Sequence, residues 1–169
     1  QFDPKATIAD YPEIDLFGYM RTTAKGDDGA KGTSNTRNAV ARLSNAIALE
    51  PFSSDLEFLT NMGLAKRGGF ENEIAQSEIQ RSYYGYTIAV DLDLVGVDGD
   101  AEIPSGEKRN RVIALLDAIE FLYRDIKGRR ENLAPLFAVG GVYQRKNPYF
   151  EHIVKVRNNS IAQDALSDI

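Results

Sequence analysis

Cysteine is absent from the 169 residues, and His152 is the only histidine. The lack of cysteine excludes disulfides, thiolate metal sites and a cysteine nucleophile. A Ser-His-Asp relay or a histidine-rich metal centre would depend on His152 alone, and a lone histidine near a strand end is more often a surface or packing residue. No run approaches the roughly 18 apolar residues of a membrane span, and the first residues, QFDPKATIADYPEID, show no secretory signal pattern. We therefore expect no membrane partner, no cofactor, no metal and no enzyme.

An excess of positive charge is also missing, because 25 acidic residues outnumber 20 basic ones and give a net charge of −5. Proteins that coat nucleic acid neutralise phosphates with lysine and arginine, so this balance argues against general coating. A basic groove on an acidic body is still compatible with it. The length and the ordinary share of apolar residues predict one domain over residues 1–169 with a buried core.

The spacing of apolar residues predicts an α+β fold with a largely antiparallel sheet and one long amphipathic helix. Val112, Leu115 and Ile119 lie at three- and four-residue spacing in a helix expected from Lys108 to Lys127, which Gly128 would end. A short helical turn is expected before the glycines of DLEFLTNMGLAKRGGF. Alternating or continuous apolar runs predict strands at residues 13–20, 40–52, 78–97, 135–143 and 152–158. Small polar residues predict a mobile insertion around 24–36 and a turn around 98–107.

The stretch RSYYGYTIAV partly imitates the strand with which RNA-recognition modules stack bases. In a continuous strand, Tyr84 and Tyr86 would share a face with Ile88 and Val90, which is the apolar face expected against the helix. Stacking requires the aromatic residues to lie on the open face instead. We therefore predict that the two tyrosines are core residues.

Two acidic patterns suggest chemistry that their surroundings do not support. Asp91, Asp93, Gly96 and Glu102 occupy positions one, three, six and twelve of a calcium loop, but Val95 stands where an oxygen ligand is needed. A strand with an acidic outer face explains these residues better. The pairs Glu13/Asp15 and Asp91/Asp93 would each share a strand face, as acid–base chemistry requires, yet no second catalytic feature accompanies them.

Basic residues occur in short groups, some of them beside glycine pairs that would let backbone N–H groups approach an anion. This is the case for KRGG and GGVYQRK, and Arg42 is expected on the polar face of a strand near Arg37. A solvated surface is the simpler interpretation of each single group. Residues 108–111 place cations at a helix start, where they oppose the helix dipole and hint at a partner.

Four segments in order, PEIDLFGYM, RNAVARLSNAIALEPFSSD, NEIAQSEIQRSYYGYTIAVDLDLVG and PLFAVGGVYQRKNPYFEHIV, resemble the DevR-type CRISPR-associated proteins. These form the repeated backbone subunit of type I Cascade, here of subtype I-B. The resemblance covers nearly the whole chain, and D-L-F-G and E-I-x-x-x-Y-x-Y are its most specific parts. It implies an RNA-recognition-like (ferredoxin-like) core with loop insertions, and an N-terminal strand and helix that would precede Gln1.

The resemblance also implies a non-catalytic, cytoplasmic subunit that binds CRISPR RNA and polymerises head-to-tail with copies of itself and other Cascade subunits in antiviral DNA targeting. Such a subunit holds the sugar–phosphate backbone and leaves the bases free to pair. RNA contact is carried over only to basic residues next to matching motifs: Arg21, Arg37, Arg42, Lys66, Arg67, Arg145 and Lys146.

Two alternatives belong to other classes of protein. Related type III backbone subunits are metal-dependent endoribonucleases, and Asp27 or Asp28 would then be the cutting residue. The acidic balance instead favours a protein-assembly or regulatory module without RNA contact. Regularly spaced cuts in complementary RNA with magnesium would indicate the nuclease, and a purified complex free of nucleic acid would indicate the assembly module.

Overall fold

The computed structural model describes residues 3, 5–22, 34–71, 74–126 and 128–166. The chain divides into two compact units, each built from two stretches of sequence. Unit 1 comprises Gln1–Ser44 and Ile88–Pro148, and unit 2 comprises Asn45–Thr87 and Tyr149–Ile169. The expectation of a single domain stays a prediction.

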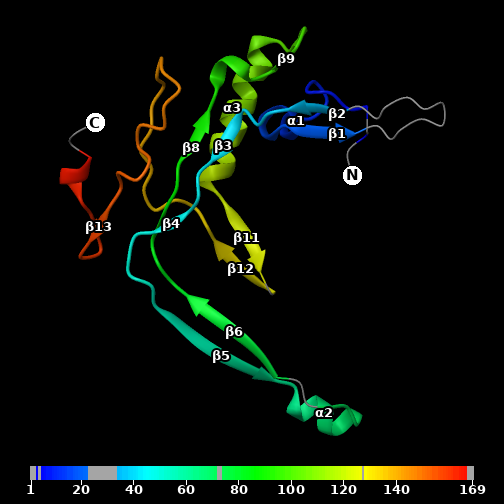
Figure 1. Ribbon diagram of the computed structural model, residues 1–169, viewed down its shortest axis with the longest axis vertical. Helices are drawn as coiled ribbons and strands as arrows, with labels where there is room; N and C mark the ends of the chain where they lie inside the picture. The colour runs from blue at the N-terminus through cyan, green and yellow to red at the C-terminus, as the bar shows by residue number, and fades with distance from the viewer. Residues whose placement is uncertain (1–2, 4, 23–33, 72–73, 127, 167–169) are drawn as a thin grey trace. The chain divides into compact units, whose positions relative to one another are not determined.

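Unit 1 holds two of the three described helices and four two-stranded antiparallel sheets (Figure 1). Its elements are α1 (Pro12–Phe17), β1 (Tyr19–Thr22), β2 (Ser34–Arg37), β3 (Ala41–Leu43), β8 (Ile88–Val90), the 3₁₀ helix η1 (Leu92–Leu94), β9 (Val97–Asp98), β10 (Ala101–Glu102), α3 (Ser105–Glu120), β11 (Tyr123–Ile126) and β12 (Arg129–Asn132). The pairs are β1–β2, β3–β8, β9–β10 and β11–β12.

Unit 2 contains a long hairpin with a short helix at its end (Figure 1). Its elements are β4 (Ile47–Ala48), β5 (Ser54–Thr60), α2 (Met62–Gly68), β6 (Ile74–Gln80), β7 (Tyr84–Gly85), β13 (Val156–Arg157), β14 (Ser160–Ile161) and the 3₁₀ helix η2 (Gln163–Ala165). The pairs β4–β7, β5–β6 and β13–β14 are antiparallel. The mixed α and β content, the antiparallel pairing and the helical turn before the glycines are therefore confirmed among the described residues.

The strand predicted at residues 13–20 is wrong, because this segment forms helix α1 followed by strand β1. Pro12 begins the helix at a position where a missing N–H costs nothing, and Glu13 and Asp15 lie in its first turn. Gly18 ends the helix with φ 74°. A Cβ at Gly18 would overlap the carbonyl oxygen of Arg37, so the turn into β1 requires glycine.

The two longest predicted strands are interrupted. Residues 40–52 form β3 and β4, and residues 78–97 form the end of β6, then β7, β8 and η1. The side-chain alternation therefore does not run unbroken from Ile88 back to Tyr84. Tyr84 is 47% exposed and Tyr86 is 40% exposed, so the prediction that they are core residues is wrong. The argument against base stacking that rested on their burial does not hold.

The long helix begins and ends earlier than predicted. Helix α3 occupies Ser105–Glu120, and Tyr123–Ile126, expected to continue it, form β11. This strand pairs with β12, and Gly128 between them has φ 77°. The apolar face of α3 is confirmed in part, because Val112 and Leu115 pack on the core whereas Leu116 is 58% exposed. Pairing with β12 provides hydrogen-bond partners for the backbone N–H and C=O groups of β11. The helical periodicity of the sequence could not reveal this pairing.

Four further segments complete the comparison with the sequence. The expected strand at 135–143 is absent from the structure, and only Val156–Arg157 of the segment 152–158 is a strand. In the region around 24–36, Ser34–Arg37 is a strand instead of a loop, whereas 23–33 lie outside the described residues. The turn around 98–107 is the β9–β10 hairpin and the start of α3.

The core of unit 1 consists of two apolar clusters. The first contains Ala6, Ile8, Ile14 and Ile103, with Tyr11 and Tyr19 packed against it. The second contains Leu16, Val40, Ala41 and Val95, with Val90, Val112 and Leu115 packed against it. Helix α1 contributes to both, since Ile14 and Leu16 belong to different clusters. Of the helices in the described ranges, none has the length and apolar character needed to span a bilayer.

Candidate RNA interface

The seven predicted RNA-contacting residues lie on five segments of the two units. In unit 1, Arg21 lies on β1, Arg37 on β2, Arg42 on β3, and Arg145 and Lys146 on the irregular segment 134–148. In unit 2, Lys66 and Arg67 lie on α2. The structure brings Arg42 and Lys146 together. RNA contact by any of the seven stays a prediction.

Arg42 and Lys146 belong to one group of four charged side chains, the surface ion cluster, which also includes Asp91 and Asp93. Arg42 on β3 places Nη2 at 2.9 Å from Oδ2 of Asp91, and its Nε donates to the carbonyl of Ala39 at 3.1 Å. Lys146 Nζ lies 3.8 Å from Oδ1 of Asp91 and 2.7 Å from Oδ1 of Asp93. Asp91 therefore links the two cations.

The members of the surface ion cluster differ in exposure. The side chains of Arg42, Lys146 and Asp93 are 56%, 54% and 63% exposed, whereas that of Asp91 is 12% exposed. The hydrogen bond from Lys146 is the largest cause that lowers the pKa of Asp93 below its ordinary value. The acidic strand face predicted for Asp91 and Asp93 is wrong, because β8 ends at Val90, Asp91 precedes η1 and Asp93 lies within it. The two carboxylates instead form ion pairs with cations from β3 and segment 134–148.

Arg145 directly precedes Lys146 in the sequence and is exposed. Its guanidinium forms no ion pair with the residues that the structure describes. Lys66 and Arg67 are exposed on the last turn of α2, and they too lack ion pairs within the described ranges. Positive charge at the end of a helix is favourable, because it interacts with the negative end of the helix dipole. These three cations are available to an anionic ligand.

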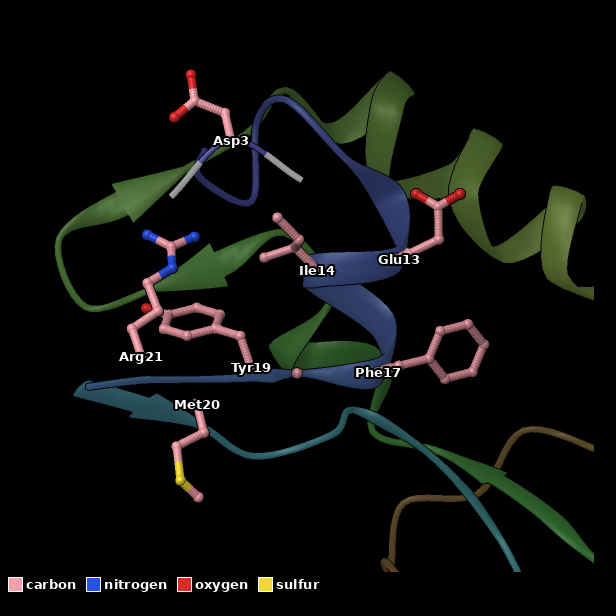
Figure 2. Close-up of a pocket in the computed structure, with 8 residues that line it drawn as sticks. Asp3, Glu13, Ile14, Phe17, Tyr19, Met20 and Arg21 are labelled. Atoms are coloured by element: carbon pink, nitrogen blue, oxygen red, sulfur yellow. The ribbon is translucent and has the colours of Figure 1, made fainter. Parts of the chain in front are cut away.

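Arg21 faces the first apolar cluster. Its guanidinium lies 4.4 Å from the centre of the Tyr19 ring and donates to the carbonyl of Ala6 (Figure 2). The hydroxyl of Tyr19 donates to Oδ2 of Asp98 at 3.0 Å, and burial, followed by this hydrogen bond, raises the pKa of Tyr19. Glu13 and Phe17 project from the other side of α1 in the same view. The open depression here has a volume of about 380 Å³ and carries both signs of charge.

Arg37 lies inside unit 1, in a group that we call the buried ion network, formed by Asp15, Arg37 and Arg111. Arg37 Nη2 is 2.6 Å from Oδ1 of Asp15, and Arg111 Nη1 is 3.0 Å from Oδ2. Asp15 is fully buried, and the side chains of Arg37 and Arg111 are 8% and 3% exposed. The three residues join α1, β2 and α3.

Backbone groups complete the buried ion network. The N–H of Gly96 donates to both carboxylate oxygens of Asp15 at 2.9 Å. Arg37 also donates to the carbonyl oxygens of Asp15 and Leu94, at 3.2 and 3.1 Å, and to that of Val97, while Arg111 donates to Ile8 at 2.6 Å. Gly96 has φ 70°, and a Cβ there would overlap the side chain of Ile103, so glycine is required at this contact.

Sequence reasoning missed Arg111 and the burial of Asp15. Two of the cations at the start of α3 have partners within the protein: Arg111 binds Asp15 and Glu107, and Lys108 binds Glu102. The position of Arg111, one residue before the apolar Val112, was the available signal. The paired carboxylates predicted at Glu13 and Asp15 do not share a strand face, because both lie on α1 and Asp15 is sealed from solvent.

The other candidate sites do not assemble in the described part of the chain. Val95 is buried and Gly96 binds Asp15, so the calcium-like loop directs these residues inward. His152 is exposed, 3.8 Å from Glu151. No group of three or more metal-binding side chains occurs among the described residues. Asp27 and Asp28 lie outside them.

Comparison with known proteins identifies a family. The family model described as CRISPR-associated negative auto-regulator DevR/Csa2 matches residues 1–163. No curated protein and no solved structure matches the chain. The match spans the D-L-F-G motif, whose Asp15 and Gly18 build the buried ion network and the turn into β1.

Proposed function

Because this chain belongs to the DevR/Csa2 family of CRISPR-associated proteins, we propose that it is a non-catalytic backbone subunit that binds CRISPR RNA. It would polymerise head-to-tail along the guide within a type I Cascade, of subtype I-B, in the cytoplasm of a prokaryotic cell. Its partners are CRISPR RNA, other Cascade subunits and copies of itself. The proposed architecture is an RNA-recognition-like (ferredoxin-like) core with loop insertions.

The observation that carries the proposal is the group of exposed cations on the surface of an acidic protein. Arg42, Arg145 and Lys146 lie on exposed parts of unit 1, and Lys66 and Arg67 lie on α2 of unit 2. Lysine and arginine of this kind bind phosphates without reading sequence. A guide-holding subunit needs such contacts, because the bases must stay free for pairing.

The hairpin of unit 2 supports the self-association part of the proposal. Several large apolar side chains are exposed on α2, just after it and at the start of β6, namely Met62, Leu64, Phe70 and Ile74. An isolated two-stranded hairpin is marginally stable in water, and exposed apolar groups of this kind are typical of surfaces that another chain covers. Replacing Phe70 with aspartate should therefore shorten the assemblies formed on a long RNA, as measured by analytical ultracentrifugation.

Binding to single-stranded RNA about forty nucleotides long, compared with duplex DNA of equal length across a salt series, tests the proposal. We expect RNA to bind more tightly and the affinity to fall steeply with salt, because each neutralised phosphate releases counterions. Equal binding of the two nucleic acids, or no binding of either, would contradict it.

A regulatory module without RNA contact is the second candidate. The description of the family as a negative auto-regulator and the net charge of −5 both favour it. The same titration separates the two candidates, since a regulatory module of this kind would leave RNA unbound at low salt.

A further inference from the structure

We propose that Asp93 competes with RNA phosphate for Lys146 and thereby sets the RNA affinity of the surface ion cluster; this inference rests on the proposed function. Lys146 Nζ contacts both carboxylate oxygens of Asp93, at 2.7 Å to Oδ1 and 2.8 Å to Oδ2. The two residues are 53 positions apart in the sequence. In the free protein the charge of Lys146 is therefore already neutralised by a carboxylate.

The Lys146–Asp93 pair can be displaced by a phosphate. Both side chains are more than half exposed, and ion pairs in such surroundings are weak because water screens them and both side chains lose conformational freedom. A phosphate approaching from solvent offers Lys146 the same kind of oxygen ligand without burying the ammonium group. Asp91 is different, because it is largely buried and stays bound to Arg42 at 2.9 Å.

Competition has a consequence for salt dependence. The affinity of a single-stranded nucleic acid falls with the logarithm of salt concentration with a slope of about −0.7 for each phosphate that the protein neutralises. When a phosphate displaces Asp93 from Lys146, the freed carboxylate stays nearby. Its negative charge offsets the attraction between Lys146 and the phosphate. Lys146 should thus contribute little to the slope in the wild-type protein, and should contribute fully once Asp93 is uncharged.

A purely structural role for Asp93 predicts a different outcome. If Asp93 only anchors segment 134–148, Asp93→Asn would lower thermal stability and leave the RNA affinity unchanged or weaker. If it competes for Lys146, the same substitution strengthens RNA binding, and the gain depends on Lys146. A double-mutant cycle distinguishes these roles, because it isolates the part of the effect that the pair shares.

The experiment measures binding of a fluorescent forty-nucleotide single-stranded RNA to the full chain by anisotropy, across a salt series. The variants are Asp93→Asn, Lys146→Met and the double variant. Asp164→Asn is the matched control, because Asp164 also forms an exposed pair, with Arg157 at 2.9 Å, and its loss changes the net charge equally. Thermal unfolding by circular dichroism checks that each variant folds.

We expect Asp93→Asn to tighten RNA binding by about two- to five-fold at low salt, the range expected for an exposed pair, and to steepen the slope by about 0.7. Lys146→Met alone should change binding little, and in the Asp93→Asn background it should abolish the gain. Asp164→Asn should bind as the wild type does.

Four results would overturn the inference. If the wild type binds RNA and Asp93→Asn binds it equally well, the inference is contradicted and the proposed function still stands. A gain that persists in the double variant, or that Asp164→Asn reproduces, shows a general charge effect and contradicts it as well. Absence of RNA binding by every variant contradicts both the proposed function and the inference.

Discussion

Two groups of charged residues in unit 1 each place one aspartate between two cations, but they differ in burial. The buried ion network holds the carboxylate of Asp15 between Arg37 and Arg111, and the surface ion cluster holds that of Asp91 between Arg42 and Lys146. The first excludes water and also uses backbone N–H and carbonyl groups. The second is largely open to solvent. The buried ion network therefore stabilises the fold, whereas the cations of the surface ion cluster can be reached by a ligand.

The two groups differ in energy because their surroundings differ. Removing one partner from a buried ion group leaves an uncompensated charge in a region of low dielectric, which costs about 3–5 kcal/mol. An exposed pair is screened by water and is far weaker. The same residue types thus have opposite consequences, and a prediction made from the sequence letters alone treats Arg37 and Arg42 as equivalent.

The largest expected effect comes from Asp15→Asn. The substitution removes the buried carboxylate that Arg37 and Arg111 share, and their other carboxylate partners, Asp98 and Glu107, are only partly buried. We therefore expect the free energy of unfolding to fall by about 3–5 kcal/mol, measured by urea denaturation. Asp125→Asn is the control, since Asp125 forms an exposed pair with Arg130 at 2.9 Å, and it should leave stability nearly unchanged. Similar effects of the two substitutions would contradict the comparison.

Much of the local structure near the buried ion network could not be predicted from the sequence. The alternation of the apolar residues Ile14 and Leu16 favours a strand. The segment is helical because of Pro12, Gly18 and the contacts from distant Arg37 and Arg111. The apolar face of α3 was predictable, because Val112 and Leu115 repeat at helical spacing. Its end was not, because the pairing of β11 with β12 overrides local preference.

The candidate interface was predictable only as a set of residue types. Glycine pairs and neighbouring motifs selected Arg42, Arg145 and Lys146, which are exposed, but the same reasoning also selected Arg37, which is buried. A sequence shows which cations exist, and it does not show which carboxylate faces each one. Asp91, which follows strand β8, and Lys146, in segment 134–148, are 55 positions apart in the sequence, and only the fold brings them together.

A moderate effect is expected for the ionisation of Asp93. Lys146 lowers the pKa of this carboxyl, so the pair contributes stability above the pKa of unfolded aspartate and loses it as the pH falls through the lower, folded value. In an NMR titration, Lys146→Met should raise the pKa of Asp93 toward its ordinary value. An unchanged midpoint would show that Lys146 does not hold Asp93 in solution.

The smallest effect is expected for the exposed tyrosines of unit 2. If RNA is held through its phosphates, Tyr84→Ala and Tyr86→Ala should change RNA affinity by less than about two-fold, since stacking contacts would cost about 1–3 kcal/mol per base. Binding measured at one salt concentration checks this. A loss of ten-fold or more would show that these side chains stack on bases, and the open positions of Tyr84 and Tyr86 would then be functional.

The measurement that tests the central claim most directly compares the RNA salt slopes of the wild type, Arg145→Glu and Arg42→Glu. We expect Arg145→Glu to weaken binding and to flatten the slope by about 0.7 for each phosphate that the variant no longer neutralises, with unchanged thermal stability. We expect Arg42→Glu to weaken binding less and to lower the thermal stability, because it places a second carboxylate beside the largely buried Asp91. Arg145→Glu should have the larger effect, because Arg42 is already paired with Asp91. Unchanged affinity and slope in both variants, with both folded, would contradict the claim that these exposed cations bind RNA.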